Sequence, residues 1–311
     1  MVREIVHPQE YIVLKHNNVF SELISLFLIK IDFLETIIHY FENIPSVHRS
    51  LILVCGISFF WLLEGFFPLI RFDYKKWKHA IPNIFFTLTT ILINFSMAFL
   101  LLKTSDWVIL NEFGILNWLP EMSLPIKVLL GVLLLDFFGA YLPHYVEHQV
   151  KPLWMIHLVH HSDHKVDTTT ANRHHPLESI VRFSFTLLGV FIIGASIGIV
   201  FLYQSLSLIA TQFSHANIKL PKSVDKVISY FLVSPDMHKT HHHYKLPYTD
   251  SNYGNIFSVW DRILGTYMEM DREKLIYGVD VFPDEKKNSN IGSLLKQPFQ
   301  KYQRPTITES D

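Results

Sequence analysis

The residues best suited to chemistry are histidines. Thirteen of the eighteen histidines in this 311-residue chain fall between His144 and His243. Eight of them stand at ligand-like spacings, one pair four residues apart and two HxxHH triplets: His144 and His148; His157, His160 and His161; His238, His241 and His242. On a helix, residues at i, i+3 and i+4 project from one face, so we expect each group to direct its imidazoles at a common point. Neutral imidazole is the commonest protein metal ligand, and eight nitrogens are too many for one ion but reasonable for two.

The remaining histidines carry less information. Those outside the cluster are isolated and are interpreted as surface residues or hydrogen-bonded core residues: His7, His16, His39, His48 and His79. A single pair at i and i+4 would also be weak support for a metal. Two triplets and a pair within a hundred residues are different. Burying so many polar rings without a metal would leave donors and acceptors unpaired.

Composition indicates that the elements positioning these histidines are membrane helices. Hydrophobic residues make up 49% of the chain, charged residues 18%, and the mean hydropathy is +0.23; soluble proteins have about 25% charged residues. A net charge of −1 argues against nucleic acid as a partner. Cys55 is the only cysteine, which excludes an intrachain disulfide and a site built from several thiolates.

Three apolar segments are long enough to cross a bilayer, at residues 51–70, 82–102 and 126–142, with Pro82 placed to begin the second helix. The loop Arg71–Lys78 carries four positive charges against one negative, whereas Lys103–Pro125 is acidic. By the positive-inside rule the first loop is cytoplasmic and the second lies outside. His144 therefore emerges on the cytoplasmic side.

A further apolar run covers residues 180–211. A single tilted helix could account for it, but histidines precede and follow the run. If all of them serve one site, the chain must cross the membrane an even number of times between them. We therefore expect a short helical hairpin that turns near Gly194–Gly198.

All-nitrogen ligation at a membrane surface favours a redox metal that acts on a lipid-soluble compound, and iron, which activates dioxygen, is the strongest candidate. Soluble di-iron bundles use paired Glu-x-x-His motifs, but the one here, Glu4 to His7, is remote and unpaired. The absence of HExxH removes the usual zinc-protease interpretation. A di-zinc hydrolase is the alternative, with Asp163 and Asp167 as the nearest additional ligands.

The order of the motifs from about Leu133 to Tyr267 resembles the sterol desaturase and fatty acid hydroxylase superfamily of membrane di-iron oxygenases. The matching motifs are His144-x-x-x-His148; His157-x-x-His160-His161; Arg173-His174-His175-Pro176-Leu-Glu178; Gln212-Phe-Ser-His215-Ala-Asn217; Ser234-Pro-Asp-Met-His238-x-x-His241-His242; and Asn252-Tyr-Gly254-Asn followed by Trp260-Asp261-Arg262-Ile-Leu-Gly265-Thr266. The resemblance implies two iron ions buried in a cytosolic, histidine-rich helical cap on a four-helix membrane stem. This agrees with the topology inferred from charge and hydropathy.

Eight histidines match the metal-binding motifs of the superfamily: His144, His148, His157, His160, His161, His238, His241 and His242. His175 and His215 would raise the number of ligands to ten. For His175 the alternative is a turn residue before Pro176, and His164, His174 and His243 are expected to be bystanders. Metal-bound imidazoles usually donate their other N–H to a carboxylate or carbonyl. The candidates for this supporting role, or for a helix cap or surface charge instead, are Asp136, Glu147, Asp163, Glu178, Asn217, Asp236 and Asp261.

The expected fold is an all-α integral membrane protein with about four to five membrane-embedded helices and a cytosolic histidine-rich cap. Its predicted parts are an N-terminal segment 1–50 with an amphipathic helix over 19–43; a membrane hairpin 51–125; a fatty acid hydroxylase-like catalytic domain 126–270, including membrane helices 126–142 and 180–213; and a polar C-terminal tail 271–311, mobile from Lys286.

The resemblance implies an oxygen-dependent enzyme that hydroxylates or desaturates a lipid of the sterol, fatty acyl or alkylglycerol type. The sequence has no Rossmann glycine pattern and no haem motif, so we expect an external electron donor, either cytochrome b5 or a ferredoxin with its reductase. The alternatives are a membrane di-zinc hydrolase acting on a lipid and a metal-transport or storage protein. The final residues Thr-Glu-Ser-Asp lack dilysine or KDEL-type signals, which favours a bacterial inner membrane over the endoplasmic reticulum.

Overall fold

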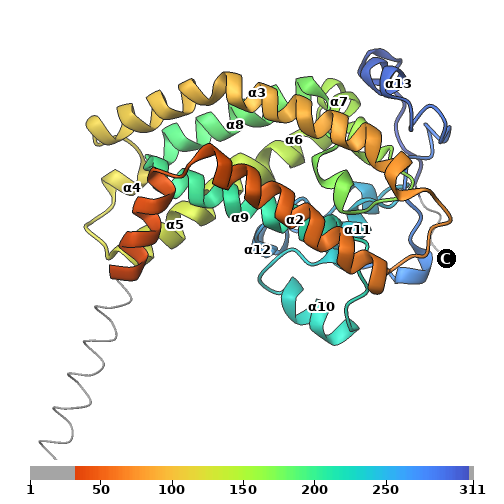
Figure 1. Ribbon diagram of the computed structural model, residues 1–311, viewed down its shortest axis with the longest axis horizontal. Helices are drawn as coiled ribbons and strands as arrows, with labels where there is room; N and C mark the ends of the chain where they lie inside the picture. Colours follow the sequence, from red (N-terminus) through yellow and green to blue (C-terminus); the bar gives the residue numbers. More distant parts are fainter. Residues whose placement is uncertain (1–31, 308–311) are drawn as a thin grey trace, which may run out of the picture.

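The computed structural model describes residues 32–307, and within that range it contains helices and isolated bridges but no named strand. Residues 32–42 are helical, and they are followed by α2 (Ser46–Phe66), α3 (Lys76–Leu110), α4 (Ile115–Trp118), α5 (Leu124–Asp136), α6 (Leu142–Gln149), α7 (Lys151–His161), α8 (Pro176–Ile193), α9 (Ile197–His215), α10 (Lys222–Ser229), α11 (Pro235–His241), α12 (Val259–Ile263) and α13 (Ile291–Lys296). The long helices lie alongside one another as a stem, and the short helices α7, α11 and α13 lie toward one end as a cap (Figure 1).

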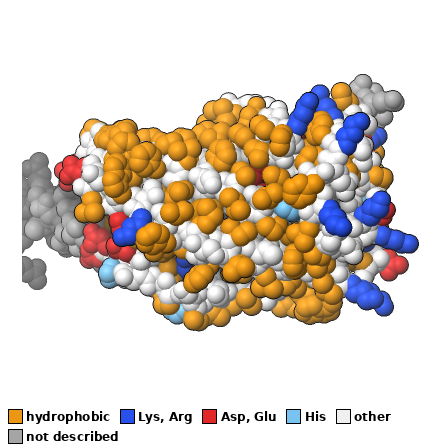
Figure 2. Space-filling model, turned by 90° about the horizontal axis from the view of Figure 1, so that it is seen from above, with side chains coloured by type: hydrophobic (Ala, Val, Ile, Leu, Met, Phe, Trp, Pro, Cys, Tyr) orange, Lys and Arg blue, Asp and Glu red, His pale blue; other side chains and the backbone are white. Residues whose placement is uncertain are grey.

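Five segments are long and apolar enough to span a membrane: Ser46–Phe66, Lys76–Trp118, Leu124–Gln149, Pro176–Ile193 and Ile197–His215. Their outer faces expose large apolar side chains such as Leu92 and Phe95. Hydrophobic side chains cover the stem in Figure 2, whereas most Lys and Arg side chains in that view gather at the cap end. The predicted all-α integral membrane fold is confirmed; the side of the membrane on which the cap lies stays a prediction.

The second span differs from its prediction at its start. Helix α3 begins at Lys76, so Pro82 lies six residues inside it and does not begin it. Proline in a helix removes one backbone hydrogen bond, and here the loss falls on the Lys78 carbonyl near the helix start. The prediction that Pro82 starts the helix is therefore wrong, because α3 begins six residues before it.

The predicted hairpin is confirmed, with its turn between α8 and α9. Gly194 ends α8 in the left-handed conformation, with φ of 74°. A Cβ at this position would lie 2.3 Å from the carbonyl oxygen of Phe113, so the turn also packs against the backbone before α4. Asn117 donates a 3.2 Å hydrogen bond to the Gly194 carbonyl and fixes this contact. Both ends of the hairpin therefore return to the histidine-rich cap.

The third span contains a π-helical turn at Phe137–Tyr141, between α5 and α6. Such turns insert one extra residue into a helix and are frequent at functional sites. Here the turn separates Asp136 from His144. It therefore decides which way the first histidine pair points.

The two ends of the chain were predicted with unequal success. Residues 32–42 of the predicted amphipathic helix 19–43 are helical, and the rest of that prediction lies outside the described residues. The C-terminal segment is not a free tail as far as residue 307. Leu294 is 1% exposed and packs with Phe86 and Val159. Apolar contacts at Leu294 therefore place this segment on the cap, and its mobility from Lys286 stays a prediction.

Candidate metal centre

Nine of the ten predicted ligands meet in two buried groups, within each of which the ligand atoms lie within 4.8 Å of one another. The five-histidine group consists of His144, His148, His157, His161 and His241. The four-histidine group consists of His160, His215, His238 and His242. The groups are adjacent, since the ring centroids of His161 and His242 are 4.7 Å apart.

Each HxxHH triplet is divided between the two groups, which corrects the expectation that its members share one point. The pair at i and i+4 stays together: His157 and His161 join one group, and His238 and His242 join the other. Consecutive residues on an α-helix are about 100° apart. The remaining member of each triplet therefore points into the neighbouring group. Each triplet thus contributes two ligands to one group and one ligand to the other.

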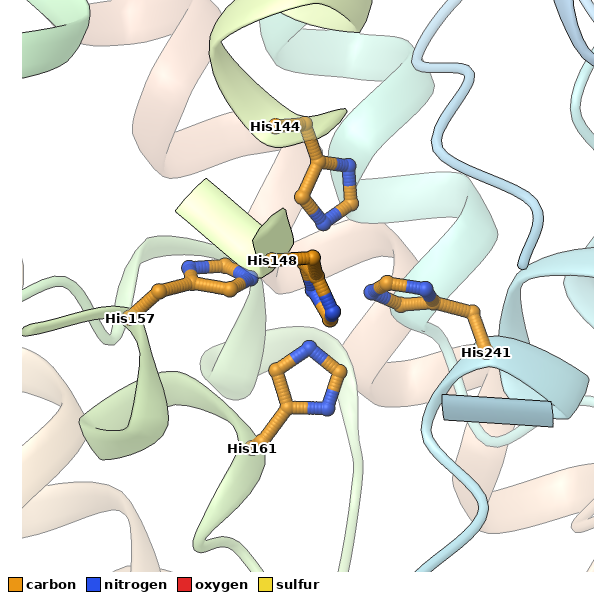
Figure 3. Close-up of side chains that lie close together, drawn as sticks. All are labelled: His144, His148, His157, His161 and His241. Carbon is orange, nitrogen blue, oxygen red and sulfur yellow. The ribbon is translucent and has the colours of Figure 1, made fainter. Parts of the chain in front are cut away.

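The five-histidine group converges from three helices, α6, α7 and α11, as Figure 3 shows. The centroid of the His241 ring lies 4.5 Å from those of His144 and His161. The Nε2 atoms of His144, His148, His157 and His241, and both ring nitrogens of His161, are buried without a hydrogen-bond partner. One unpaired nitrogen of each ring faces a shared centre (Figure 3).

The outer nitrogens of this group are held by acceptors on other segments. The Nδ1 atoms of His144 and His241 lie 2.9 and 2.6 Å from the carbonyl oxygens of Tyr253 and Ser251. Two carboxylates hold the next pair, with His148 Nδ1 3.0 Å from Asp250 Oδ1 and His157 Nδ1 2.7 Å from Glu178 Oε1. An imidazole that donates from Nδ1 presents a lone pair at Nε2, which is the form a metal binds.

The four-histidine group centres on His215, whose Nε2 lies 3.1, 3.0 and 3.2 Å from the Nε2 atoms of His160, His238 and His242. Nitrogens that share an ion at about 2.0–2.1 Å are about 3 Å apart, so this spacing fits a common metal. His215 donates from Nδ1 to the Thr211 carbonyl at 2.7 Å. The Nδ1 atoms of the other three rings are buried without a partner. Fewer outer hydrogen bonds therefore hold the rings of the four-histidine group than those of the five-histidine group.

Burial keeps these rings uncharged. Desolvation, followed by repulsion from neighbouring rings, lowers the pKa of the ligand histidines on α7 and around α11 well below the ordinary value of 6.5: His157, His160, His161, His238, His241 and His242. Metal binding requires neutral imidazole, so the lowered pKa values keep these rings in the form that binds a metal cation. An all-imidazole donor set suits iron, zinc, copper or nickel, whereas calcium and magnesium prefer oxygen ligands.

His175 is the one predicted ligand that joins neither group. Its Nδ1 accepts a 3.2 Å hydrogen bond from the backbone N–H of Leu177, and the ring thereby caps the N-terminus of α8. Residues before a helix-starting proline commonly cap in this way. The structure therefore removes His175 from the ligand set.

Among the predicted supporting residues, only Glu178 contacts a ligand directly within hydrogen-bond distance. Asp136 and Asp261 do not contact a ligand themselves but bind the loop that does. Asp136 accepts from the backbone N–H groups of Ile256 and Phe257, at 3.1 and 3.2 Å. Asp261 accepts from the N–H of Tyr253 at 2.7 Å. Both carboxylates fix the loop whose Tyr253 carbonyl holds His144.

The other four supporting candidates do not reach the histidines of the two groups within hydrogen-bond distance. Glu147 accepts from Arg182 at 2.7 Å, and its carboxylate lies 3.8 Å from His157 Nδ1. Asp163 lies 2.8 Å from Nε2 of His79, which is interpreted from the sequence as a surface residue or a hydrogen-bonded core residue. Asp236 accepts from Arg272 at 2.6 Å. Asn217 bonds the backbone of Ile70 through both side-chain atoms. Asp163 and Asn217 thereby connect the cap to α3 and to the segment that follows α2.

Sequence reasoning missed several partners. Asp250 lies 102 residues from His148, and backbone carbonyls leave no mark in a sequence. His174 had a usable signal, its spacing of four from Glu178; its Nδ1 lies 2.6 Å from Glu178 Oε1, and its ring stacks on His160 at 4.9 Å. Together with His157 these two residues form a third, smaller group.

Comparisons with known proteins agree with this site. Residues 128–266 match the family described as fatty acid hydroxylase. The chain is 24% identical to the ornithine lipid hydroxylase OlsE of Rhizobium tropici over 191 residues, 61% of this chain and 55% of that protein. It is 29% and 28% identical to the alkylglycerol monooxygenases of Xenopus tropicalis and Homo sapiens, over 46% of this chain and 30% and 31% of theirs.

These matches cover between about a third and about half of the length of those three relatives. No solved structure shows significant similarity to the chain. The family match spans all nine clustered histidines. The comparisons therefore support the predicted resemblance to the sterol desaturase and fatty acid hydroxylase superfamily over this part of the chain.

Proposed function

We propose that this protein is a membrane-bound, non-haem di-iron oxygenase that hydroxylates or desaturates a lipid with dioxygen and electrons from an external donor. One observation carries the proposal: two adjacent groups of buried imidazoles, five and four, whose Nε2 atoms converge without protein partners other than one another. Unpaired buried nitrogens cost free energy unless something binds them. Two metal ions would satisfy both groups.

Iron bound there would supply the power to activate dioxygen for attack on an unactivated C–H bond. The chain's own residues do the remaining work. Four outer acceptors hold the rings of the five-histidine group in one tautomer. Burial excludes water, and every ring of both groups is at most 8% exposed. The apolar stem holds the centre beside the bilayer, where a lipid chain can reach it.

The names of two relatives, which specify ornithine lipids and alkylglycerols, support a proposal for the substrate class. Both pair an apolar chain with a polar head, and we propose a lipid of this kind for the present chain. The electron donor is a separate protein, either cytochrome b5 or a ferredoxin with its reductase. The basic loop Arg71–Lys78 at the cap end supports a cytoplasmic position for the cap. A bacterial inner membrane is the proposed location.

Metal analysis combined with oxygen uptake tests the proposal. The purified protein should contain two irons per chain and consume oxygen only with both a reductant and a lipid extract. His160→Ala should abolish this uptake, and His39→Ala is the control because His39 has a 79% exposed side chain. A di-zinc hydrolase would instead cleave lipid without oxygen or reductant and contain zinc. A fully active His160→Ala variant would contradict the proposal.

A further inference from the structure

A second apolar surface lies outside the stem, on α10 and the residues around it. We call it the α10 ledge; it consists of residues 222–232 together with Ile263 and Leu264. Val227 is 64% exposed, Phe231 74% and Ile263 68%. Helix α10 stands clear of the long helices, below α2 in Figure 1. Single exposed apolar residues are ordinary, but a contiguous group of this size marks an interaction surface.

The α10 ledge is amphipathic with its polar face turned inward. Asp225 is buried and accepts from Ser234 Oγ at 2.8 Å and from the Asp236 N–H at 3.2 Å. The Ser229 carbonyl accepts from Ser258 Oγ at 2.7 Å and from Arg262 at 2.8 Å. Polar contacts therefore fasten the helix to the cap and leave its apolar face outward. A helix at a soluble surface has the opposite arrangement.

The α10 ledge lies where two spans end. Helix α9 ends at His215, and the segment after it pairs with the segment after α2. The Leu69 N–H donates to Asn217 at 3.0 Å, and the Lys219 N–H donates to Phe67 at 2.8 Å. Phe67 itself is 62% exposed. The exposed Phe67 at the end of α2 thus lies beside the segment that leads from α9 to the start of α10.

Basic residues border the α10 ledge on one side. A hollow of about 630 Å³ is lined by Leu69, Lys219, Leu220, Pro221, Lys222, Arg272 and Glu273. Arg272 is paired with Asp236, whereas Lys219 and Lys222 have no ion pair among residues 32–307. A lysine near a membrane surface is attracted to anionic headgroups. Apolar residues beside unpaired lysines are typical of helices that lie in a membrane interface.

We propose that the α10 ledge inserts into the headgroup–acyl boundary of the leaflet at the cap end, with Lys219 and Lys222 on anionic phosphate groups. The occupant is the lipid surface, because the ledge follows the segment beside Phe67 at the end of α2, a helix apolar enough to span a membrane, and its charged border is basic. The ledge then fixes the depth of the cap. Asp225 connects the inserted helix to Ser234, the N-cap of the helix that carries His238 and His241.

Site-directed spin labelling of the full-length protein in vesicles tests this proposal. Phe231→Cys and Val227→Cys are made in a Cys55→Ser background, with Lys286→Cys on the exposed C-terminal segment as the control. We expect nitroxides at 231 and 227 to be accessible to oxygen and shielded from a water-soluble nickel chelate, with the reverse at 286. Equal nickel accessibility at all three positions would overturn the proposal.

Two further arms separate the competing occupants. Lys219→Gln combined with Lys222→Gln should make the label at 231 shallower in vesicles that contain anionic lipid and leave its depth unchanged in purely zwitterionic vesicles. No dependence on anionic lipid would overturn the role of the lysines. A defined short distance between the 231 labels of two chains, with the shielding lost on dilution, would identify a second copy as the occupant and overturn the proposal.

Discussion

Glu178 Oε1 lies 2.7 Å from His157 Nδ1, and the same oxygen lies 2.6 Å from His174 Nδ1 and 3.0 Å from Arg182 Nε. One buried carboxylate thus orients a ring of the five-histidine group and a ring that stacks on the four-histidine group. Arg182 also donates to Glu147 at 2.7 Å, so the carboxylate is itself held in place. Partners of this kind set both the tautomer and the basicity of a ligand.

Glu178→Gln should weaken metal binding at the five-histidine group. The amide keeps the shape of the side chain but removes the charge that His157 faces, and loss of such a partner typically costs about 10- to 100-fold in affinity. Competition with a chromophoric chelator measures this change. Glu121→Gln is the matched control, because Glu121 is exposed in the loop before α5. Unchanged affinity with intact helicity would contradict the orienting role of Glu178.

Chelation should remove the two proposed ions in two steps. In the five-histidine group four rings are held through Nδ1, whereas in the four-histidine group only His215 is. We expect the ion in the four-histidine group to dissociate about 10- to 100-fold faster than the ion in the five-histidine group, because it has fewer ligands and those ligands have fewer outer partners. Elemental analysis during dialysis against a chelator measures both phases.

Single substitutions assign those phases. His242→Ala should retain one ion per chain that leaves slowly, and His148→Ala should lose the slow phase. Both readouts count metal and do not depend on turnover. A single phase for both ions, or the slow phase surviving in His148→Ala, would show that the outer partners do not govern retention.

His175→Asn should leave the metal content unchanged, because His175 caps α8 and does not join either group. Asparagine is a good N-cap and should keep the stability of the helix, whereas His175→Ala should cost about 1 kcal/mol. Elemental analysis and thermal unfolding of the two variants measure these effects. Loss of one ion per chain in His175→Asn would restore His175 to the ligand set.

The metal-free protein should lose stability on acidification. Burial lowers the pKa of His157, His161 and their neighbours well below 6.5 in the folded state, whereas an unfolded histidine titrates near about 6.5. The unfolded chain therefore binds more protons below about pH 6.5. Stability is present above that pH and falls by up to about 1.4 kcal/mol per histidine for each pH unit below it.

Unfolding midpoints of the metal-free protein in detergent, from about pH 8 to about pH 5, measure this slope. His161→Leu removes one titrating ring, both of whose nitrogens lack partners, and should make the slope shallower. His39→Ala should leave it unchanged, because the His39 side chain is exposed. A midpoint independent of pH would mean that the rings are not held neutral.

The ligand pairs could be predicted from the sequence because their members lie within one helical turn of each other. Positions 144 and 148, and the pairs within each triplet, follow from helical periodicity alone, and the apolar runs gave the spans and the Gly194 turn. The assignment of His160 and His161 to different groups was also within reach, since neighbours on a helix diverge by about 100°. The assumption of a common point for each triplet hid this feature.

Other parts depend on contacts between distant segments. Asp250 reaches His148 only because the chain folds back over 102 residues. The carbonyls of Ser251 and Tyr253 hold two ligands, although any residue type supplies a carbonyl. The role of His175 was undecided from sequence, since the motif before Pro176 serves equally for a cap and a ligand.

The π-turn at Phe137–Tyr141 has a consequence for anyone who aligns or redesigns this helix. Deleting one residue from it would restore regular winding and swing His144 and His148 by about 100° around the axis relative to Asp136. His144 and His148 would still be present, yet they would no longer reach the residues that hold them. A gapless superposition on an ordinary helix would make the same error, so the surplus residue is as much a part of the centre as the imidazoles.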